Sequence, residues 1–508
     1  MGGIFVTVLE MLGDLPCEEI LGMSPWFDGT AVCGAARRDA RCVERGDVFF
    51  CIRGTHFDGH TAIGQAACRG ASLVVLEEMR YADTCPIPWI CIRDTRAAFL
   101  PACLCAAGHP ERGMHLYAVT GTNGKTSVTY LLEAMFSSDP EYAPCAVIGT
   151  VENRIAGENF PTSATTPPPE ELCALLCHAR ERGVKTVILE ASSHALAQGR
   201  LSGLHFDAGI FTNLTEDHLD YHGSMEDYFL CKRRLFFSCS SMIANADDPY
   251  GIRLLLDEDI PAEKISFSLA GNYPHAFRAQ PHPVGNGTRL TVTSPDGAEN
   301  ELSSPLRGSF AAQNITAAAV CAYSAGLSHK TVQTGLSSLE NIPGRMECIV
   351  ETPFSVFVDY AHTPDALRRA ICSVKNMPSD PGTTARTLVL FGCGGDRERE
   401  KRPQMGAIAS ELADISIITS DNSRSEDPLA IIGDIVAGIP DSPHAEIHIV
   451  PDRKQAIETV LSLAHPGDSV LLAGKGHENY QIDRDGRHPF SEKEIVHDYI
   501  PREHVPHE

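Results

Sequence analysis

The sequence predicts an α/β protein built mainly from parallel sheets. Two observations favour this class. Short apolar runs alternate with helical patterns through the middle of the chain and again toward its C-terminus, which is typical of βαβ units. Several of these runs also end in loops rich in glycine or polar residues, as strands do at the ligand-binding edge of a parallel sheet. The length of 508 residues is sufficient for roughly three domains.

The first segment, residues 1–112, combines short strands and turns. We expect a strand within 46–54, a turn at 58–60, a helix over 62–67 and a strand over 72–76. The polar stretch 108–113 contains proline and glycine and marks the boundary. Residues 1–10 contain no basic segment before an apolar run, so we predict no signal peptide.

The second segment, residues 113–343, shows the clearest alternation. Strands are predicted at 116–120, 185–190, 207–212, 241–245 and 264–268. An alanine-rich helix over 311–325 closes the segment, and Pro343 with Gly344 indicates a linker.

The third segment, residues 344–508, has three apolar runs at 388–391, 415–418 and 470–473. Each run leads into a loop that carries glycine, charged or amide residues. If the runs are parallel strands, the three loops meet at one edge of the sheet, where open α/β sheets bind ligands.

The stretch 117–126 predicts a phosphate-binding loop. An apolar strand breaks into a glycine-rich turn, and a helical pattern begins at Ser127. Such a turn directs backbone N–H groups at an anion on the helix N-terminus. Lys125 would reach the outer phosphates, and the Thr126 hydroxyl would face a magnesium ion. Val119 takes the place of the first glycine of the strict motif. The loop residues are Gly121, Thr122, Asn123, Gly124, Lys125 and Thr126.

Two further strand ends carry acidic and histidine side chains. Glu190 follows an apolar run and suits a magnesium ligand, because hard cations prefer oxygen; alternatively it caps the following helix. The stretch 213–222 holds carboxylates, an amide and two histidines, and either His218 or His222 could be a ligand.

Charge and cysteine content exclude several classes of protein. Forty-two basic and 66 acidic residues give a formal net charge of −24, which opposes non-specific nucleic-acid binding. The 18 cysteines have no paired metal-binding spacing, so we expect reduced thiols. No apolar run is long enough to span a membrane, and we expect a cytosolic monomer.

Short motifs occur along nearly the whole chain at 58–60, 120–126, 165–167, 189–196, 212–222, 245–249, 344–347, 358–367, 394–397, 421–428 and 474–478. Together they resemble the Mur ligase family of ATP-dependent peptidoglycan enzymes. The resemblance implies the three-domain architecture of that family. It has an N-terminal UDP-binding domain, a central P-loop ATPase domain with a mainly parallel sheet, and a C-terminal Rossmann-like domain that binds an amino acid.

The resemblance also implies roles for single residues. Residues that match the UDP-MurNAc-dipeptide site are Asp39, Arg41, Thr165, Thr166, Ser192, Gln198 and Arg200. Ala40 replaces a serine of the family motif, so one hydroxyl contact is lost. Residues that match the catalytic and magnesium positions are Lys125, Thr126, Glu190, His218 and Lys232. Lys232 matches a carbamylated lysine, and a carbamate is an anionic oxygen ligand that suits Mg²⁺ better than an ammonium does.

Two more residue sets follow from the resemblance. Outside the phosphate loop, the residues matching nucleotide contacts are Asn213, Asn314, Arg345, Asp359 and His362. The segment 309–313 departs from the usual form, so the adenine pocket is expected to differ. The residues matching the amino-acid site are Arg397, Asp421, Asn422, Arg424, Gly474 and Glu478. In the family this arginine goes with meso-diaminopimelate; here Ser423 replaces the proline before it.

The resemblance implies an ATP-dependent, ADP-forming ligase. It would add the third amino acid, meso-diaminopimelate, to UDP-MurNAc-L-Ala-D-Glu through an acyl phosphate, with Mg²⁺ as cofactor. Alternatives are the same ligase with L-lysine or another amino acid, a folylpolyglutamate synthase or a second muramyl ligase, and a non-catalytic nucleotide-binding paralogue. The 474–478 loop and the 58–60 region argue against a folate enzyme, and intact Lys125, Glu190, His218 and Lys232 argue against a non-catalytic paralogue.

Overall fold

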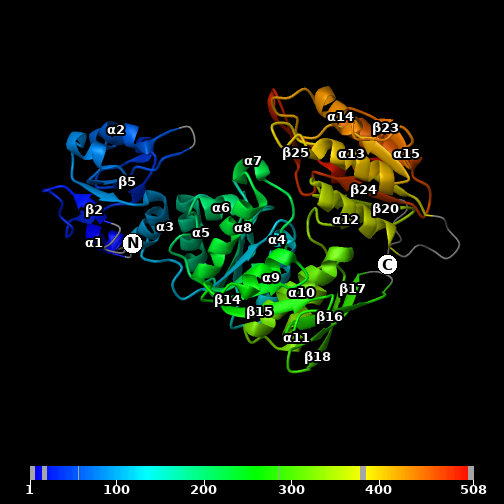
Figure 1. Cartoon of the computed structure of the whole chain (residues 1–508), viewed down its shortest axis with the longest axis horizontal. Helices are drawn as coiled ribbons and strands as arrows, with labels where there is room; N and C mark the ends of the chain where they lie inside the picture. The colour runs from blue at the N-terminus through cyan, green and yellow to red at the C-terminus, as the bar shows by residue number, and fades with distance from the viewer. Residues whose placement is uncertain (1–5, 14–19, 55–56, 285–286, 378–384, 501–508) are drawn as a thin grey trace.

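The computed structural model describes residues 6–13, 20–54, 57–284, 287–377 and 385–500. It has the predicted three-domain α/β architecture. Figure 1 shows the N-terminal and C-terminal domains at opposite ends of the molecule, with the central domain between them. The signal-peptide prediction for residues 1–10 falls partly on residues 1–5, which lie outside the described residues.

The N-terminal domain contains a five-stranded sheet in the order β2-β7-β6-β5-β4, in which only the edge strand β2 is antiparallel. The predicted turn at 58–60 is a 3₁₀-helix that Asp58 caps. The elements are β1 (Val6–Thr7), α1 (Val8–Leu12), β2 (Ile20–Met23), β3 (Val32–Cys33), β4 (Ala36–Arg37), η2 (Ala40–Cys42), β5 (Val48–Phe50), η3 (Gly59–Ala62), α2 (Ile63–Cys68), β6 (Leu73–Leu76), η4 (Met79–Thr84), β7 (Trp89–Ile92) and α3 (Thr95–Ala106).

The central domain is built on an eleven-stranded sheet in the order β11-β10-β9-β12-β8-β13-β14-β15-β16-β17-β18. Strands from β9 to β16 in this order are parallel, and antiparallel strands extend both edges. Its strands are β8 (His115–Thr120), β9 (Cys145–Ile148), β10 (Asn153–Ile155), β11 (Glu158–Phe160), β12 (Thr186–Glu190), β13 (Phe206–Phe211), β14 (Cys239–Asn245), β15 (Glu263–Ser268), β16 (Phe277–His282), β17 (Thr288–Thr293) and β18 (Glu299–Ser304).

Helices cover both faces of this sheet, and two separate buried hydrophobic clusters lie on its two sides. One cluster continues from α5 into α3 of the N-terminal domain, so these two domains share a packed core. The helices are α4 (Lys125–Ser137), α5 (Pro169–Glu181), α6 (Ser193–Ala197), α7 (Leu219–His222), α8 (Met225–Arg233), η5 (Arg234–Ser238), α9 (Pro249–Leu256), α10 (Ser309–Ser324) and α11 (His329–Ser338).

The C-terminal domain has a six-stranded sheet in the order β19-β20-β24-β21-β22-β23, with β19 antiparallel, and a separate hairpin of β25 and β26. Hydrophobic clusters cover both faces. The elements are β19 (Glu347–Val350), β20 (Ser355–Asp359), α12 (Pro364–Lys375), β21 (Thr387–Phe391), α13 (Lys401–Leu412), β22 (Ile415–Ile418), α14 (Pro428–Val436), β23 (Glu446–Ile449), α15 (Arg453–Leu463), β24 (Ser469–Ala473), β25 (Tyr480–Asp483), β26 (Gly486–Pro489) and α16 (Glu492–Tyr499).

The topology places the functional loops as predicted. All the strands expected from apolar runs are present, and β24, β21 and β22 are parallel neighbours, so their following loops share one edge. In the central sheet β12, β8 and β13 are likewise parallel neighbours. One prediction is wrong: the helix after the glycine-rich turn begins at Lys125, two residues before Ser127, because the left-handed Gly124 already serves as its N-cap. The domain boundaries at 112 and 343 stay predictions.

Two further properties concern the described residues. None of their helices combines the length and apolarity needed to cross a membrane. Their cysteines are free thiols, as the spacing predicts.

Candidate functional site

The glycine-rich loop between β8 and α4 can adopt its shape only with glycine at two positions. Gly121 has φ +147°, and a Cβ there would lie 1.9 Å from the Thr212 hydroxyl oxygen. Gly124 has φ +88°, and a Cβ there would lie 2.6 Å from Oδ1 of Asn314. Both positions therefore require a residue without a side chain. The close approach also brings α10 and the strand end after β13 against the loop.

The strand end after β13 fixes the loop through several hydrogen bonds. The Thr212 hydroxyl donates to the Asn123 carbonyl at 2.6 Å, and Asn213 Oδ1 accepts from the Asn123 amide at 3.0 Å. The Thr122 amide donates to the Asn213 carbonyl at 2.9 Å. The loop is thus held before any ligand arrives, with its concave side open at the N-terminus of α4, a favourable place for an anion.

Two lysines lie behind and beside this loop, and neither makes a hydrogen bond to a carboxylate of the described residues. Lys125 Nζ donates to the carbonyls of Gly121 and Thr122, both at 2.9 Å. Lys232 is 1% exposed, and its Nζ donates to the same Gly121 carbonyl at 2.9 Å. Burial lowers the pKa of Lys125, and it lowers the pKa of Lys232 well below its ordinary value, with the charge of Lys125 adding to the effect.

Glu190 ends β12 and is 1% exposed. Its carboxylate accepts from the amide of Thr150 at 2.9 Å and from the Thr150 hydroxyl at 2.8 Å. The alternative that Glu190 caps the next helix is wrong, because Ser192 is the N-cap of α6 and accepts from the Ala195 amide.

His218 and His222 have different surroundings. His218 has φ +56° and lies beside Asp217, with 3.4 Å between Nε2 and Oδ2, and burial lowers its pKa to about 4. His222 is bonded to the Ser193 hydroxyl at 2.9 Å and stacks on the Tyr228 ring. Of these two histidines, His218 lines the two cavities described below and His222 lines neither, so the structure favours His218 as a ligand.

A cavity of about 260 Å³ lies between the loop and the C-terminal domain. Arg345 crosses the domain junction: its Nη2 donates to the Thr126 hydroxyl at 3.0 Å, and its guanidinium lies 4.8 Å from the Tyr360 ring centre. Asp359 holds the amides of Met346 and Ala361. The predicted nucleotide and metal residues that line this cavity are Thr122, Asn123, Gly124, Lys125, Thr126, Glu190, Asn213, His218, Asn314, Arg345, Asp359 and His362. Gly121 of the loop and Lys232, whose Nζ donates to the Gly121 carbonyl, do not line this cavity.

A second cavity, of about 370 Å³, lies at the carboxyl edge of the C-terminal sheet. Every residue predicted for the amino-acid site lines it, namely Arg397, Asp421, Asn422, Arg424, Gly474 and Glu478. The two cavities share Thr165, Asp217, His218, Tyr360 and His362. A group held at this shared wall is therefore within reach of ligands in both cavities.

The residues predicted to hold the dipeptide fall into two groups. Arg200 donates from Nη1 to the Thr166 carbonyl at 2.6 Å and from Nη2 to Gln198 Oε1 at 2.8 Å, and the Thr166 hydroxyl contacts that of Ser192 at 3.2 Å. The Thr165 hydroxyl accepts from that of Thr150 at 3.1 Å.

Asp39 and Arg41 lie on the N-terminal domain and are ion-paired with each other at 2.7 Å. Ala40 between them is buried and belongs to the domain core, so this side chain faces inward.

Sequence patterns did not single out several residues that the structure brings to the site. Thr150 orients Glu190, and Asp217 lines both cavities. Lys401, at the start of α13, lines the second cavity. Asp217 lay within the predicted 213–222 cluster, and this was the only signal available for it. Thr150 and Lys401 lie in segments without any motif.

The fold and site together define a multidomain α/β ligase, in which a phosphate-type loop faces a second ligand cavity across a domain junction. The chain belongs to the Mur ligase family. Its residues 119–322 match the Mur ligase middle domain, and residues 344–476 match the Mur ligase, glutamate ligase domain.

Relatives match most of the chain. The UDP-N-acetylmuramoyl-L-alanyl-D-glutamate–2,6-diaminopimelate ligase of Clostridium perfringens is 38% identical over 472 residues, covering 91% of this chain and 94% of the relative. The ligase of the same name from Gloeobacter violaceus is 40% identical over 452 residues, covering 87% and 89%. A solved structure of a ligase with this name is similar at 31% identity and TM-score 0.70, covering 99% and 100%.

A more distant likeness concerns the fold alone. The Mycobacterium tuberculosis folylpolyglutamate synthase complexed with ADP and AMPPCP has TM-score 0.60 at 17% identity, and covers 75% of this chain and 92% of that chain.

Proposed function

We propose that this chain joins meso-diaminopimelate to UDP-MurNAc-L-Ala-D-Glu with hydrolysis of ATP to ADP and phosphate. The observation that carries the proposal is the pair of adjoining cavities, one at the phosphate loop and one lined by the complete predicted amino-acid set. The names of relatives that match most of the chain give UDP-N-acetylmuramoyl-L-alanyl-D-glutamate and 2,6-diaminopimelate as the molecules that they join. We further propose that it acts as a cytosolic monomer in peptidoglycan precursor synthesis.

ATP would bind in the cavity at the loop. The loop amides and Lys125 would receive the β- and γ-phosphates, since Lys125 has no carboxylate within hydrogen-bond distance that competes for its charge. Arg345, Asn314 and Asp359 line the rest of the cavity. Phe310, in the segment that departs from the family form, also lines it and lies against Arg369. The Phe310 ring and the Arg369 guanidinium would form the pocket for the adenine base of ATP.

A magnesium ion fits the residues present. Among the described residues, no group of three or more His, Cys, Asp or Glu side chains forms a ready metal site. Mg²⁺ does not need one, because it typically takes one or two protein ligands together with phosphate oxygens and water. Thr126, Glu190 and His218 line the same cavity, and Lys232 as a carbamate would add an anionic oxygen near them. When bound, the ion would neutralise charge on the phosphates.

The reaction needs positioning more than covalent protein chemistry. The terminal carboxylate of the dipeptide attacks the γ-phosphorus, ADP leaves, and an acyl phosphate forms. The amine of the incoming amino acid then attacks the acyl carbon, and phosphate leaves. Lys125 would offset charge in the first step. Thr166, Ser192, Gln198 and Arg200 would hold the dipeptide near the shared wall, while Asp39 and Arg41 would bind its UDP end.

His362 faces the cavities from the C-terminal domain and suits a role in the second step. Its Nδ1 lies 2.7 Å from the Tyr360 carbonyl, so Nδ1 must carry the proton. Burial lowers the pKa of His362, which favours the neutral ring with an accepting Nε2. Such a nitrogen could accept a proton from the attacking amine.

Specificity for diaminopimelate would come from Arg424 and Glu478. Arg424 Nη1 is already bonded to the Gly395 carbonyl at 2.7 Å, which orients the guanidinium and leaves Nη2 for a distal carboxylate. The Arg424 amide donates to the Ile482 carbonyl at 3.1 Å, so β25 holds the loop although Ser423 replaces proline. Lysine lacks the distal carboxylate and would leave Arg424 unpaired.

The deciding experiment compares kcat/KM for meso-diaminopimelate and L-lysine. We expect diaminopimelate to be preferred by roughly tenfold to over a hundredfold, the cost of leaving the half-buried Arg424 guanidinium without its ligand carboxylate. Arg424→Ala should reduce this preference, and Arg399→Ala, which removes a neighbouring exposed arginine, should not. Equal or better use of lysine would overturn the amino-acid assignment. Absence of phosphate release with every amino acid would instead favour a non-catalytic paralogue.

A further inference from the structure

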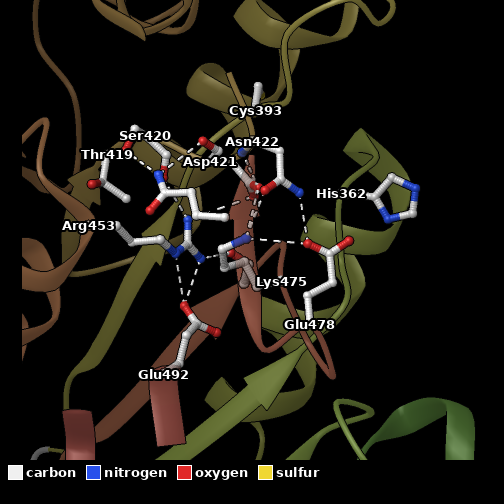
Figure 2. A network of polar contacts seen from close by, with 12 residues as sticks. His362, Cys393, Thr419, Ser420, Asp421, Asn422, Arg453, Lys475, Glu478 and Glu492 are labelled. Atoms are coloured by element: carbon white, nitrogen blue, oxygen red, sulfur yellow. Dashed lines mark hydrogen bonds and ion pairs between the residues drawn. The ribbon is translucent and has the colours of Figure 1, made fainter. Parts of the chain in front are cut away.

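A network of buried charges lies directly behind the amino-acid cavity (Figure 2). Its two cations are Lys475, which is 0% exposed, and Arg453, which is 1% exposed. Its carboxylates are Asp421, Glu478 and Glu492. Lys475 does not line the cavity, so it acts only through its neighbours.

Lys475 contacts the two cavity residues that face an amino-acid ligand. Its Nζ donates to Asn422 Oδ1 at 3.1 Å, to Glu478 Oε2 at 3.3 Å and to the Tyr480 carbonyl at 2.7 Å. Three donors thus meet three acceptors, and Asp421 lies a further 3.6 Å away. The buried ammonium is fully used by the protein and has no hydrogen left for a ligand.

These contacts determine how the Asn422 amide is turned. Oδ1 accepts from both Lys475 and the Ile482 amide, the latter at 2.9 Å. Because an ammonium and an amide N–H can only donate, the oxygen must face them and Nδ2 must face the other way. Nδ2 donates to Glu478 Oε2 at 2.8 Å. One oxygen of Glu478 is therefore held twice.

The second oxygen of Glu478 lies on the side of His362 and the cavity (Figure 2). The network contains three carboxylates but only two cations, so one negative charge is not offset within it. Since Glu478 is its member at the cavity, a ligand ammonium placed there would balance the charge.

We propose that Lys475 is a positioning residue for amino-acid selection. It locks Asn422 and Glu478 in the orientation in which Glu478 presents one free oxygen to a cationic group of the incoming amino acid. This inference rests on the proposed function for the identity of that amino acid. Lys475 itself does not line the cavity and cannot touch the substrate.

The chain offers a matched control for a merely structural role. Arg453 is as buried as Lys475 and belongs to the same network. Its guanidinium donates to Glu492 Oε1 at 2.9 Å and to the carbonyls of Ser420 and Ala473 at 3.0 and 2.8 Å. It lies 3.8 Å from Oδ2 of the cavity residue Asp421 and does not touch Asn422 or Glu478. Removing Arg453 should cost stability without a selective effect on the amino acid.

The test uses Lys475→Met, Lys475→Arg and Arg453→Met in the full chain. We expect Lys475→Met to raise KM for the amino acid roughly tenfold to a hundredfold, the range for a charged partner left unmet. KM for ATP and for the UDP substrate should stay within about twofold, as for independent sites. Lys475→Arg keeps the charge, but a planar guanidinium cannot direct donors at the same three acceptors, so it should also raise the amino-acid KM. It provides the test if the methionine variant does not fold.

A double-mutant cycle with Glu478→Gln sharpens the result. If Lys475 acts through Glu478, Lys475→Met should change the amino-acid KM much less in the Glu478→Gln background than in the wild type. Additive effects, equal rises in all three KM values, or a wild-type amino-acid KM in both Lys475 variants would overturn the inference. Kinetics of the wild-type enzyme first show which amino acid is used, and the variants are then measured with that amino acid. A wrong substrate assignment can therefore be told apart from a wrong role for Lys475.

Discussion

Two regions of this molecule hold buried or half-buried cations in opposite ways. At the phosphate-type loop, Lys125 and Lys232 donate to backbone carbonyls, and no carboxylate lies within ion-pair distance of either in the described structure. Behind the amino-acid cavity, Lys475 and Arg453 are paired with carboxylates: Lys475 Nζ lies 3.3 Å from Glu478 Oε2, and the Arg453 guanidinium lies 2.9 Å from Glu492 Oε1. The family resemblance assigns roles to Lys125 and Lys232, but no sequence pattern shows which of the four basic residues is paired with a carboxylate.

The electrostatic consequences also differ. Burial lowers the pKa of Lys125 and, more strongly, that of Lys232. Burial also opposes the charge of Arg453, but Glu492 and Asp421 outweigh it and raise the pKa above its ordinary value. An unpaired buried cation is costly to keep, whereas a paired one is part of the fold. The lysines without a carboxylate partner therefore indicate a site for an anionic substrate or a covalent modification. The paired cations indicate a structural role.

The largest expected effect concerns the two lysines that have no carboxylate partner, Lys125 and Lys232. Lys125→Ala should abolish ligation and leave binding of the UDP substrate and the free energy of unfolding nearly unchanged, because no ion pair is lost. Phosphate release, binding of the UDP substrate and chemical unfolding measure the three properties. Near-normal turnover would show that the loop assignment is wrong.

Lys232 sharpens the comparison further, because a buried amine without a carboxylate partner is suited to carbamylation. The neutral amine attacks CO₂, an N–C bond forms and a proton is released. We expect Lys232→Ala to lose most activity, whereas the exposed Lys330→Ala should change stability by less than about 0.5 kcal/mol and retain activity.

A direct measurement follows from the same prediction. Depleting bicarbonate should lower wild-type activity, and restoring it should recover that activity. A high-resolution map with ATP and magnesium that shows a plain ammonium at Lys232 would contradict it.

The paired region should respond in the opposite sense. Arg453→Met leaves Glu492 and the carbonyls around it without their partner, and such losses cost about 3–5 kcal/mol of stability. The remaining folded enzyme should keep its KM for the amino acid. Urea unfolding and steady-state kinetics on the same preparation measure both properties. If Arg453→Met changed the amino-acid KM without changing the free energy of unfolding, the structural role assigned to the paired cations would be wrong.

The positions of the functional loops could be predicted because parallel strands leave a local pattern. An apolar run that breaks into polar residues marks the carboxyl edge of a strand, and neighbouring strands bring such edges together. Glu190, His218, Asn422 and Glu478 lie where this reasoning placed them. The start of α4 was misplaced because the left-handed conformation of Gly124 cannot be read from apolar periodicity.

Contacts between separate segments could not be predicted in the same way. Thr150 is 40 residues from Glu190, and Lys475 is 53 residues from Asn422. Neither pair has a spacing that a helix or strand would explain. The choice between a paired and an unpaired cation depends on such contacts, so it becomes visible only in the folded structure.

A smaller effect is expected at the junction of the two regions. The N-cap of α7 is His218, whose side chain supplies no capping hydrogen bond. Instead Glu398 of the C-terminal domain accepts from the Leu219 amide at 2.7 Å. Glu398→Ala should cost about 1 kcal/mol of stability, the worth of a capping bond, and should lower kcat because it removes this contact between the domains. Glu398→Gln keeps an acceptor and should retain most activity, and Glu400→Ala is the exposed control. If all three variants had the same kcat, Glu398 would have no role in holding the two domains together.

The change expected to affect activity least concerns a further buried cation of the C-terminal domain, which is also paired with a carboxylate. Arg402 is 0% exposed, and its Nη2 donates to Glu426 at 2.8 Å. Hydrogen bonds from Arg402 hold the pKa of Glu426 at about 2, below its ordinary 4.5.

The stabilisation by this pair is therefore complete above about pH 4.5 and is lost as the pH falls toward 2, an effect on the order of 2–3 kcal/mol. Glu426→Gln should flatten the fall in unfolding free energy between pH 6 and about pH 3. The control is Glu411→Gln, because Glu411 is 63% exposed at the side chain and pairs with Arg368 at 3.4 Å. If both variants keep the wild-type pH slope, the Arg402–Glu426 pair does not support the fold as Arg453 does, and the contrast between the two regions narrows to the network around Lys475.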